Sequence, residues 1–247
     1  MRIEILSRFS RTVIWAHEIK GNNLKITVEA AVRVGINLTR AHLAKANLSG
    51  ARLYGANLDS AFLAGADLSG ADLAEASLAG AYLAGVNLSG ANLVGANLSG
   101  AYLATANLSE ANLARTTLDK ADLFKADLSG ANLTRAYLDG ADLTRTILSG
   151  AYLGGCEKLI GQRPIFQVGP IGPWGTRFTA YLTDRGLRFD AVGLRQVSRE
   201  IFEQYLSNEL NDSVHREEYQ ALLALIDTHA GLWAPKEEQK GVFQRED

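Results

Sequence analysis

The sequence predicts a solenoid in which the chain turns a corner after every five residues, with separate segments capping its two ends. Three observations lead to this fold class. Every fifth residue from Leu38 to Leu153 is leucine, which gives 24 leucines without a gap. Alanine stands two positions before 20 of these 24 leucines. All four prolines and two of the three tryptophans follow residue 155, so the repeat differs in composition from the C-terminal segment.

Residues 1–35 are predicted to cap the start of the solenoid. Segments 2–9 and 13–19 alternate charged and apolar residues and are expected to form two strands. Segment 23–34 has the apolar spacing of a short amphipathic helix, and Gly35 follows as its expected C-cap. A cap is needed because the open end of a stacked β structure can pair with other chains.

A five-residue period fits neither common secondary structure. In an α-helix, successive leucines would be rotated by about 500° and would lie on every side. In a strand, they would alternate between two faces. The leucines share one interior only if the chain turns after each repeat, and four such sides close a coil of about 20 residues. Stacked at the inter-strand spacing of about 4.8 Å, about six coils would form a rod about 29 Å long.

The leucines are predicted to point inward and to form the core of the solenoid. Burial of each leucine contributes about 1.5–3 kcal/mol. Alanine is expected beside them because a wider side chain would collide with the neighbouring coils. One inward series, with members 20 residues apart, comprises Leu43, Leu63, Leu83, Leu103, Leu123 and Leu143.

The A-(D/N)-L-x-x pattern resembles the pentapeptide-repeat family over the segment from Ile36 to Gly155. This resemblance implies an all-β solenoid, namely a right-handed quadrilateral β-helix of about six coils. Some members of that family resemble B-form DNA and bind type II topoisomerases. Residues 36–155, however, hold ten acidic and eight basic residues, and Arg115, Arg135 and Arg145 interrupt the acidic ones. Binding of a topoisomerase, with protection or inhibition of gyrase, is therefore an alternative that the mixed charge disfavours.

Residues 156–235 are predicted to form a small α+β domain, followed by a charged tail at 236–247. Strands are expected over 164–168, 177–182 and 187–192, and helices over 197–210 and 214–233. These flanks resemble those of bacterial and phage-type pentapeptide-repeat proteins without an assigned role. The apolar faces of the two helices make this domain the expected site of homodimerisation.

Aromatic residues form the candidate interaction surface of the solenoid. Phe62, Tyr82 and Tyr102 are spaced 20 residues apart in register with His42, and Phe124 lies beside this series. One interpretation is a contact surface, because aromatic residues are enriched at interfaces. The other is packing of the rings against one another along the ladder. Residues 76–109 carry no charge. This uncharged belt could be a surface that receives a partner or a second copy of the chain, or it could reflect drift of the sequence toward the repeat consensus.

Composition excludes several classes of protein. The 25 basic and 27 acidic residues give a net charge of −2, whereas a nucleic-acid-binding protein is typically strongly basic. The single cysteine, Cys156, excludes an internal disulfide. We expect no membrane span, because no apolar run reaches about 18 residues. The N-terminus lacks the apolar core of a signal peptide, so we expect a cytoplasmic protein.

No residues with the spacing of a catalytic, cofactor-binding or metal-binding motif are found in the sequence. The predicted function is therefore a non-enzymatic protein-interaction scaffold or regulator, with an unidentified protein partner and no cofactor. Two alternatives remain, namely the topoisomerase binding described above and small-ligand binding in the C-terminal domain. The latter requires a concave, polar pocket.

Overall fold

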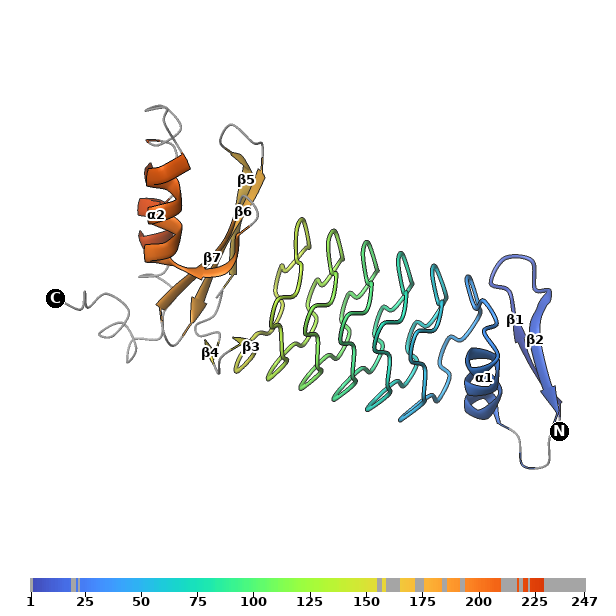
Figure 1. Ribbon diagram of the computed structural model, residues 1–247. Helices are drawn as coiled ribbons and strands as arrows, with labels where there is room; N and C mark the ends of the chain where they lie inside the picture. The colour runs from blue at the N-terminus through green and yellow to red at the C-terminus, as the bar shows by residue number, and fades with distance from the viewer. Residues whose placement is uncertain are drawn as a thin grey trace. The chain divides into compact units, whose positions relative to one another are not determined.

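The structure is a computed structural model of the 247-residue chain. It describes residues 2–18, 21, 23–154, 157–158, 165–171, 176–183, 186–191, 194–209, 217, 220–221 and 223–228. The chain divides into two compact units, Met1–Ile147 and Leu148–Asp247 (Figure 1). Among the described residues, no helix has the length and apolar character needed to cross a membrane.

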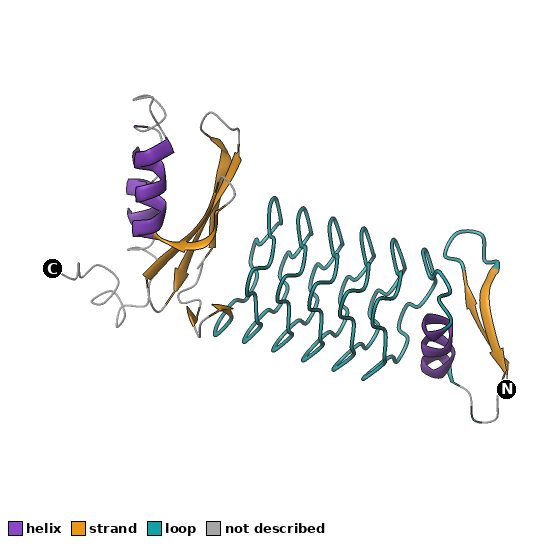
Figure 2. Cartoon of the chain, in the orientation of Figure 1, coloured by secondary structure: helices purple, strands orange, loops and turns teal. Residues whose placement is uncertain are grey.

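The repeats wind into coils that stack along the first unit (Figure 1). Parallel backbone bridges join residues 20 positions apart, as from His42 to Phe62 and from Phe62 to Tyr82. Each coil therefore has 20 residues and four five-residue sides. The bridges are isolated, so the coils are drawn as loops rather than strands (Figure 2). A five-residue side is too short for an extended strand because the corner turn takes up part of it. The right-handed winding stays a prediction.

A regular set of backbone hydrogen bonds holds neighbouring coils together. Leu43 N donates to Phe62 O at 2.8 Å, and Phe62 N donates to Ala41 O at 2.9 Å. At the corner, Ala46 N donates to Leu43 O at 3.2 Å and closes a turn. The second central residue of that turn, Lys45, has φ of 58°, as type II turns require. The residue at this corner position has positive φ in every repeat from Arg40 to Gly150, which explains the many glycines there.

The leucines and alanines of the repeats form the core. In the predicted series, five leucines are at most 1% exposed, namely Leu43, Leu63, Leu83, Leu103 and Leu123. Leu143 departs from the series and is only half-buried. It lies in the last coil of the first unit, and no further coil of that unit covers it.

Two threonines replace alanine in the core without leaving an unpaired hydroxyl. Thr116 is fully buried, and its Oγ1 donates to Leu93 O at 2.8 Å. Thr146 makes the equivalent bond to Leu123 O, also at 2.8 Å. A buried hydroxyl is tolerated when it is hydrogen-bonded, so these positions keep the coil geometry.

The N-terminal segment forms a hairpin and a helix beside the first coil. Strands β1 (Arg2–Leu6) and β2 (Val13–Glu18) pair in an antiparallel ladder, and helix α1 spans Leu24–Arg33. Strand β1 is shorter than the predicted strand over 2–9, and the predicted end of the second strand at residue 19 lies outside the described residues. The Asn23 side chain accepts a hydrogen bond from Ile26 N at 2.9 Å and caps the helix.

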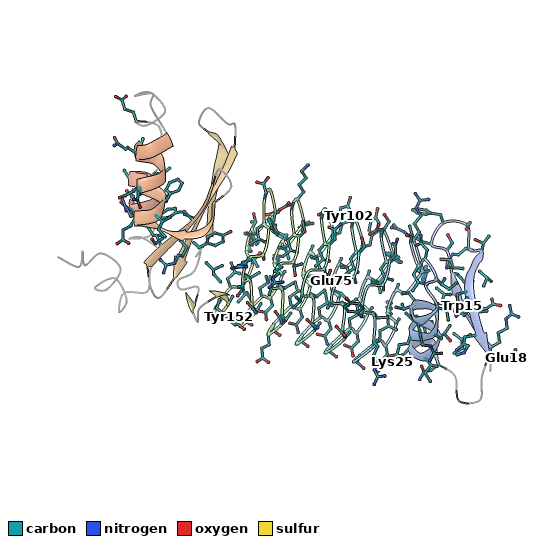
Figure 3. The ribbon with its side chains drawn as sticks, in the orientation of Figure 1. Trp15, Glu18, Lys25, Glu75, Tyr102 and Tyr152 are labelled. Atoms are coloured by element: carbon teal, nitrogen blue, oxygen red, sulfur yellow. The ribbon has the colours of Figure 1, made fainter. Side chains whose placement is uncertain are left out.

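This segment supplies partners to the open edge of the first coil. His42 N donates to Leu6 O at 2.8 Å, and Arg52 N donates to Glu29 Oε1 at 2.9 Å. Lys25 Nζ donates to Ser49 O at 2.6 Å (Figure 3). Strand β1 and two side chains of α1 thus replace a preceding coil, and they satisfy backbone groups that would otherwise lack a partner in the protein.

The second unit contains two sheets and a helix. Strands β3 (Tyr152–Gly154) and β4 (Glu157–Lys158) pair with each other. An antiparallel four-stranded sheet has the order β5-β6-β7-β8, with strands at Ile165–Ile171, Thr176–Thr183, Gly186–Ala191 and Leu194–Ser198. Helix α2 spans Arg199–Glu209, and residues 223–228 are also helical.

The C-terminal elements differ from the prediction at several places: strand β5 continues to Ile171 beyond its predicted end at 168, and no strand was predicted over Leu194–Ser198. A helix was expected over 197–210, but Val197 pairs with Phe189 and Ser198 with Arg188, so both belong to strand β8. Helical spacing alone could not reveal this pairing, because it depends on the neighbouring strand. Of the helix expected over 214–233, residues 217, 220, 221 and 223–228 are described and helical. The tail at 236–247 lies outside the described residues.

The second unit is stabilised by specific side-chain pairs. The rings of Phe189 on β7 and Phe202 on α2 stack with centroids 5.2 Å apart. Arg199 on α2 forms ion pairs with Glu203 and Asp227, both at 2.6 Å. The second pair connects α2 with the helical residues 223–228.

Candidate interaction surface

The predicted aromatic series forms a continuous column on one side of the coils. We call His42, Phe62, Tyr82 and Tyr102 the aromatic column. Its ring centroids are 5.4, 6.3 and 4.8 Å apart in chain order. The first two contacts are edge-to-face, whereas Tyr82 and Tyr102 stack with an interplanar angle of 16°. Such geometries are favourable for aromatic pairs, so the rings do pack against one another.

The N-terminal hairpin covers the first part of this column. The Arg8 guanidinium carbon lies 3.7 Å from the centroid of the Tyr82 ring and 4.8 Å from that of Phe62. Its Nη1 is buried and has no hydrogen-bond partner among the residues that the structure describes. Arg8 is thus held by cation–π contacts, which sequence reasoning missed because Arg8 lies outside the repeat and carries no periodic signal.

The last ring of the column faces solvent. Tyr102 is 47% exposed, and the position that follows it in the column is Asp122 and then Asp142 (Figure 3). The column therefore changes from aromatic to acidic at this point. The rings pack along the column, and the interpretation of Phe62, Tyr82, Tyr102 and Phe124 as a contact surface stays a prediction.

Phe124 lies next to the column and not within it. It follows Leu123 at the corner of the coil, and its backbone N donates to Asp122 Oδ1 at 3.0 Å. Lys125 Nζ lies 5.1 Å from the centroid of the Phe124 ring. Phe124 therefore forms a separate cation–π pair beside the acidic part of the column.

Carboxylate and amide side chains satisfy backbone groups along the coils. Ser69 hydrogen-bonds Asp67 through its side chain and its backbone N, and these bonds lower the pKa of the Asp67 carboxyl below its ordinary value. Thr144 lowers the pKa of Asp142 in the same way. In the uncharged belt at residues 76–109, Asn87 and Asn92 donate to Asp67 and Asp72 of the preceding coil at 3.1 and 2.9 Å. A role of this belt as an interface stays a prediction.

No group of three or more His, Cys, Asp or Glu that could hold a metal is present in the part of the chain that the structure describes. Arg199, one of a cluster of arginines in the second unit, is engaged by Asp227 and Glu203. The hydrogen bond to Asp227 raises the pKa of the Arg199 guanidinium.

Coils of four five-residue sides define the repeat segment as that of a solenoid protein. Pentapeptide repeats match the sequence in eight copies, over residues 36–73, 71–107, 96–135 and 121–157. Through this segment, the chain belongs to the pentapeptide-repeat family.

Solved structures of the same kind are similar to this chain. The pentapeptide repeat protein Rfr23 from the cyanobacterium Cyanothece 51142 is 36% identical over 48% of this chain and 63% of its own, with a TM-score of 0.27. The match thus spans less than two thirds of Rfr23. The pentapeptide repeat protein alr5209 from Nostoc Pcc 7120 is 30% identical over 52% of this chain and 94% of its own, with a TM-score of 0.33.

A third similar structure is QnrB1, a plasmid-mediated fluoroquinolone resistance protein. It is 21% identical over 46% of this chain and 80% of its own, with a TM-score of 0.23. No curated protein matches the sequence.

Proposed function

We propose that the chain is a non-enzymatic protein-interaction scaffold whose repeat segment presents a fixed surface to a protein partner. The observation that carries this proposal is Tyr102, an exposed aromatic side chain whose backbone N and O are hydrogen-bonded to the preceding coil. Aromatic residues are enriched at interfaces, and solenoids typically bind through extended surfaces.

The regular backbone favours this function energetically. Both Tyr102 N and the neighbouring Leu103 N donate to other coils, at 2.9 and 2.7 Å. A surface held in this way loses little conformational freedom when a partner binds, so more of the contact energy appears as affinity.

Topoisomerase binding by DNA mimicry is the alternative function. It requires a continuous acidic face, whereas Asp122 and Asp142 share their column with aromatic rings. Arg115 and Arg135 stand 20 residues apart at another corner of the same coils. Purified protein that protected or inhibited gyrase in a supercoiling assay would favour this alternative, and absence of both effects would exclude it.

Self-association is a separate part of the proposal. Ile201 on α2 and Leu225 in the second helical segment are both about half exposed, at 51% and 46%. These side chains support a homodimer formed through the C-terminal unit. Light scattering at micromolar protein should give the mass of a dimer, and a monomer mass would refute it. Small-ligand binding in this unit has no comparable support, and we do not propose it.

Site-specific crosslinking tests the scaffold function. A photoreactive phenylalanine derivative replaces Tyr102, Tyr54 or Tyr137 on the coils, or Ile201 or Leu225 on the helices, in the full-length chain. After irradiation in the native host, we expect one protein to crosslink from a coil position and to bind when purified. Crosslinks to a partner from the helices alone, or no crosslinked partner, would contradict the proposal.

A further inference from the structure

We propose that Tyr102 and Asp122 form a docking site for an arginine side chain of the protein partner. This inference rests on the proposed scaffold function and names the chemistry of the contact between the coils and the protein partner. It follows from the way in which the chain already binds one of its own arginines on the same column.

The stacked pair of Tyr82 and Tyr102 has two outer faces, and Arg8 covers the first. The guanidinium carbon of Arg8 lies 3.7 Å from the Tyr82 centroid and 4.8 Å from that of Phe62. Phe62 is on the side of Tyr82 opposite to Tyr102 in the ladder, so Arg8 lies on that side as well. The negative face of the ring attracts the cation, and the planar guanidinium can stack on it.

The second outer face belongs to Tyr102 and is unoccupied by any described ring or cation. The ring is 47% exposed, and the next position of the ladder is Asp122. At the Tyr82 face, Phe9 and Phe62 also lie within 5.1 Å of Arg8, whereas no second described ring flanks the Tyr102 face. A carboxylate follows it, which would add an ion pair to the cation–π contact.

The Asp122 carboxylate retains the capacity to pair with an incoming cation. Its Oδ1 accepts from Phe124 N at 3.0 Å, and among the described residues its other oxygen has no hydrogen-bond partner. Lys120 and Lys125 stand at the two adjacent corners of the coil, but neither forms an ion pair with Asp122 within the described part of the chain. Lys125 instead lies over the Phe124 ring, 5.1 Å from its centroid.

Arginine fits this site better than lysine does. Its guanidinium is planar, so it can stack on the tyrosine while its edge donates to the carboxylate. Lysine carries a compact, strongly hydrated charge and cannot do both in one plane. The site therefore selects an arginine on a partner surface, and Asp142 in the next coil extends the negative charge along the column.

Fluorine NMR of the full-length protein tests the site directly. The tyrosines are labelled as 3-fluorotyrosine, and the Tyr102 resonance is identified by its loss in Tyr102→Phe. The probe is N-acetyl-arginine methylamide, and the control is the neutral citrulline analogue at equal ionic strength. We expect the Tyr102 resonance to move saturably with the arginine probe, at least about threefold more than the exposed Tyr54 resonance. Equal shifts of the two tyrosines, or equal effects of the two probes, would overturn the proposal.

A matched pair of variants tests the role of the carboxylate. Asp122→Asn should weaken binding of the arginine probe by about threefold, whereas Asp127→Asn should not. Asp127 occupies the same repeat position on the next side of the coil, and asparagine is common at that position, so both variants retain a residue that suits the fold. An unchanged affinity for the arginine probe in Asp122→Asn would show that the carboxylate is not part of the site.

The outcomes for the two proposals are distinguishable. If a partner crosslinks from a coil position but the arginine probe does not shift Tyr102, the scaffold function stands and the arginine site is wrong. If the probe binds at Tyr102 but no partner crosslinks from the coils, the site exists and the scaffold function fails.

Discussion

The repeat segment and the C-terminal unit are stabilised in different ways. In the coils, one set of backbone bonds recurs every 20 residues, and leucine or alanine fills almost every equivalent place in the core. The C-terminal unit depends on pairs that occur once, such as the Phe189–Phe202 stack and the Arg199–Asp227 ion pair. The comparison shows that a residue's role in the coils follows from its place in the repeat, whereas a role in the C-terminal unit depends on a distant partner.

Removal of a core side chain from each unit should have the largest effect. Leu83→Ala leaves a cavity among fully buried leucines and should lower the free energy of unfolding of the coils by about 3–5 kcal/mol. Phe202→Ala should destabilise the C-terminal unit by a similar amount, about 3–5 kcal/mol. Hydrogen exchange measured peptide by peptide in denaturant reports the two units separately.

The end of the stack provides a control for this prediction. Leu143 is half-buried, so Leu143→Ala should cost about 1–2 kcal/mol, less than Leu83→Ala. Equal costs at the two leucines would show that position along the stack is irrelevant. Loss of protection in both units after either Leu83→Ala or Phe202→Ala would show that the units are not independent, and the comparison would fail.

The first coil is predicted to behave like the C-terminal unit, because specific side chains complete it. Glu29→Ala removes the acceptor of Arg52 N and should lower the stability of the coils by about 1 kcal/mol. Glu29→Gln retains an oxygen acceptor and should restore most of this loss. Chemical denaturation of both variants measures the difference. A Gln variant as unstable as the Ala variant would indicate that the charge of Glu29 matters more than the hydrogen bond.

Corner residues should allow a gain in stability that the described residues of the C-terminal unit do not offer, since none of them other than glycine has positive φ. Lys120 has φ of 60°, and its backbone N–H bond to Asp139 O does not depend on the side chain. Lys120→Gly relieves the left-handed conformation and should stabilise the coils by about 0.5–1 kcal/mol.

Gly90→Ala provides the opposite change at an equivalent corner. Gly90 has φ of 63° and open space where a Cβ would be placed, so only the backbone conformation opposes alanine. The variant should lose about 1 kcal/mol in thermal or chemical unfolding. A neutral result at both corners would mean that positive φ costs little in this fold.

The difference between repeated and unrepeated segments also determines which contacts could be predicted from the sequence. The period places Leu83 and Ala81 correctly, because each is defined by its own repeat. It also places Phe62, Tyr82 and Tyr102 in one column. It cannot show that Arg8 covers part of that column or that Glu29 completes the first coil, because these contacts join segments with different patterns.

The predicted start of helix α2 at residue 197 is wrong for the same physical reason. Val197 and Ser198 lie between the other residues of strand β8 and a segment that has the apolar spacing of a helix. They belong to the strand because they pair with Phe189 and Arg188 of β7. Tertiary contacts thus override local preference where a segment is not repeated.

Acid should weaken the coils slightly through carboxylates whose pKa values are lowered by hydrogen bonds. The pKa of Asp67 lies below its ordinary value of 3.8, chiefly because the Ser69 side chain and backbone donate to the ionised form. A carboxyl with a lowered pKa in the folded state contributes stability above its unfolded pKa, and this stability is lost as the pH falls below that value. The melting temperature should therefore decrease on acidification from pH about 6 to about 3 by less in Asp67→Asn than in the natural chain.

Ser69→Ala distinguishes the hydrogen bond from other causes of this small effect. It leaves the Asp67 carboxylate in place but removes the Ser69 hydroxyl that donates to it, so the pH dependence of the melting temperature should decrease in the same direction. Because Asp67 is well solvated, both changes are expected to be smaller than those at Glu29 or Lys120. If Asp67→Asn flattened the profile and Ser69→Ala did not, the remaining donors, namely Ser69 N and the Asn87 side chain, would account for the lowered pKa. The local regularity of the coils, rather than the side-chain pair, would then govern their response to acid.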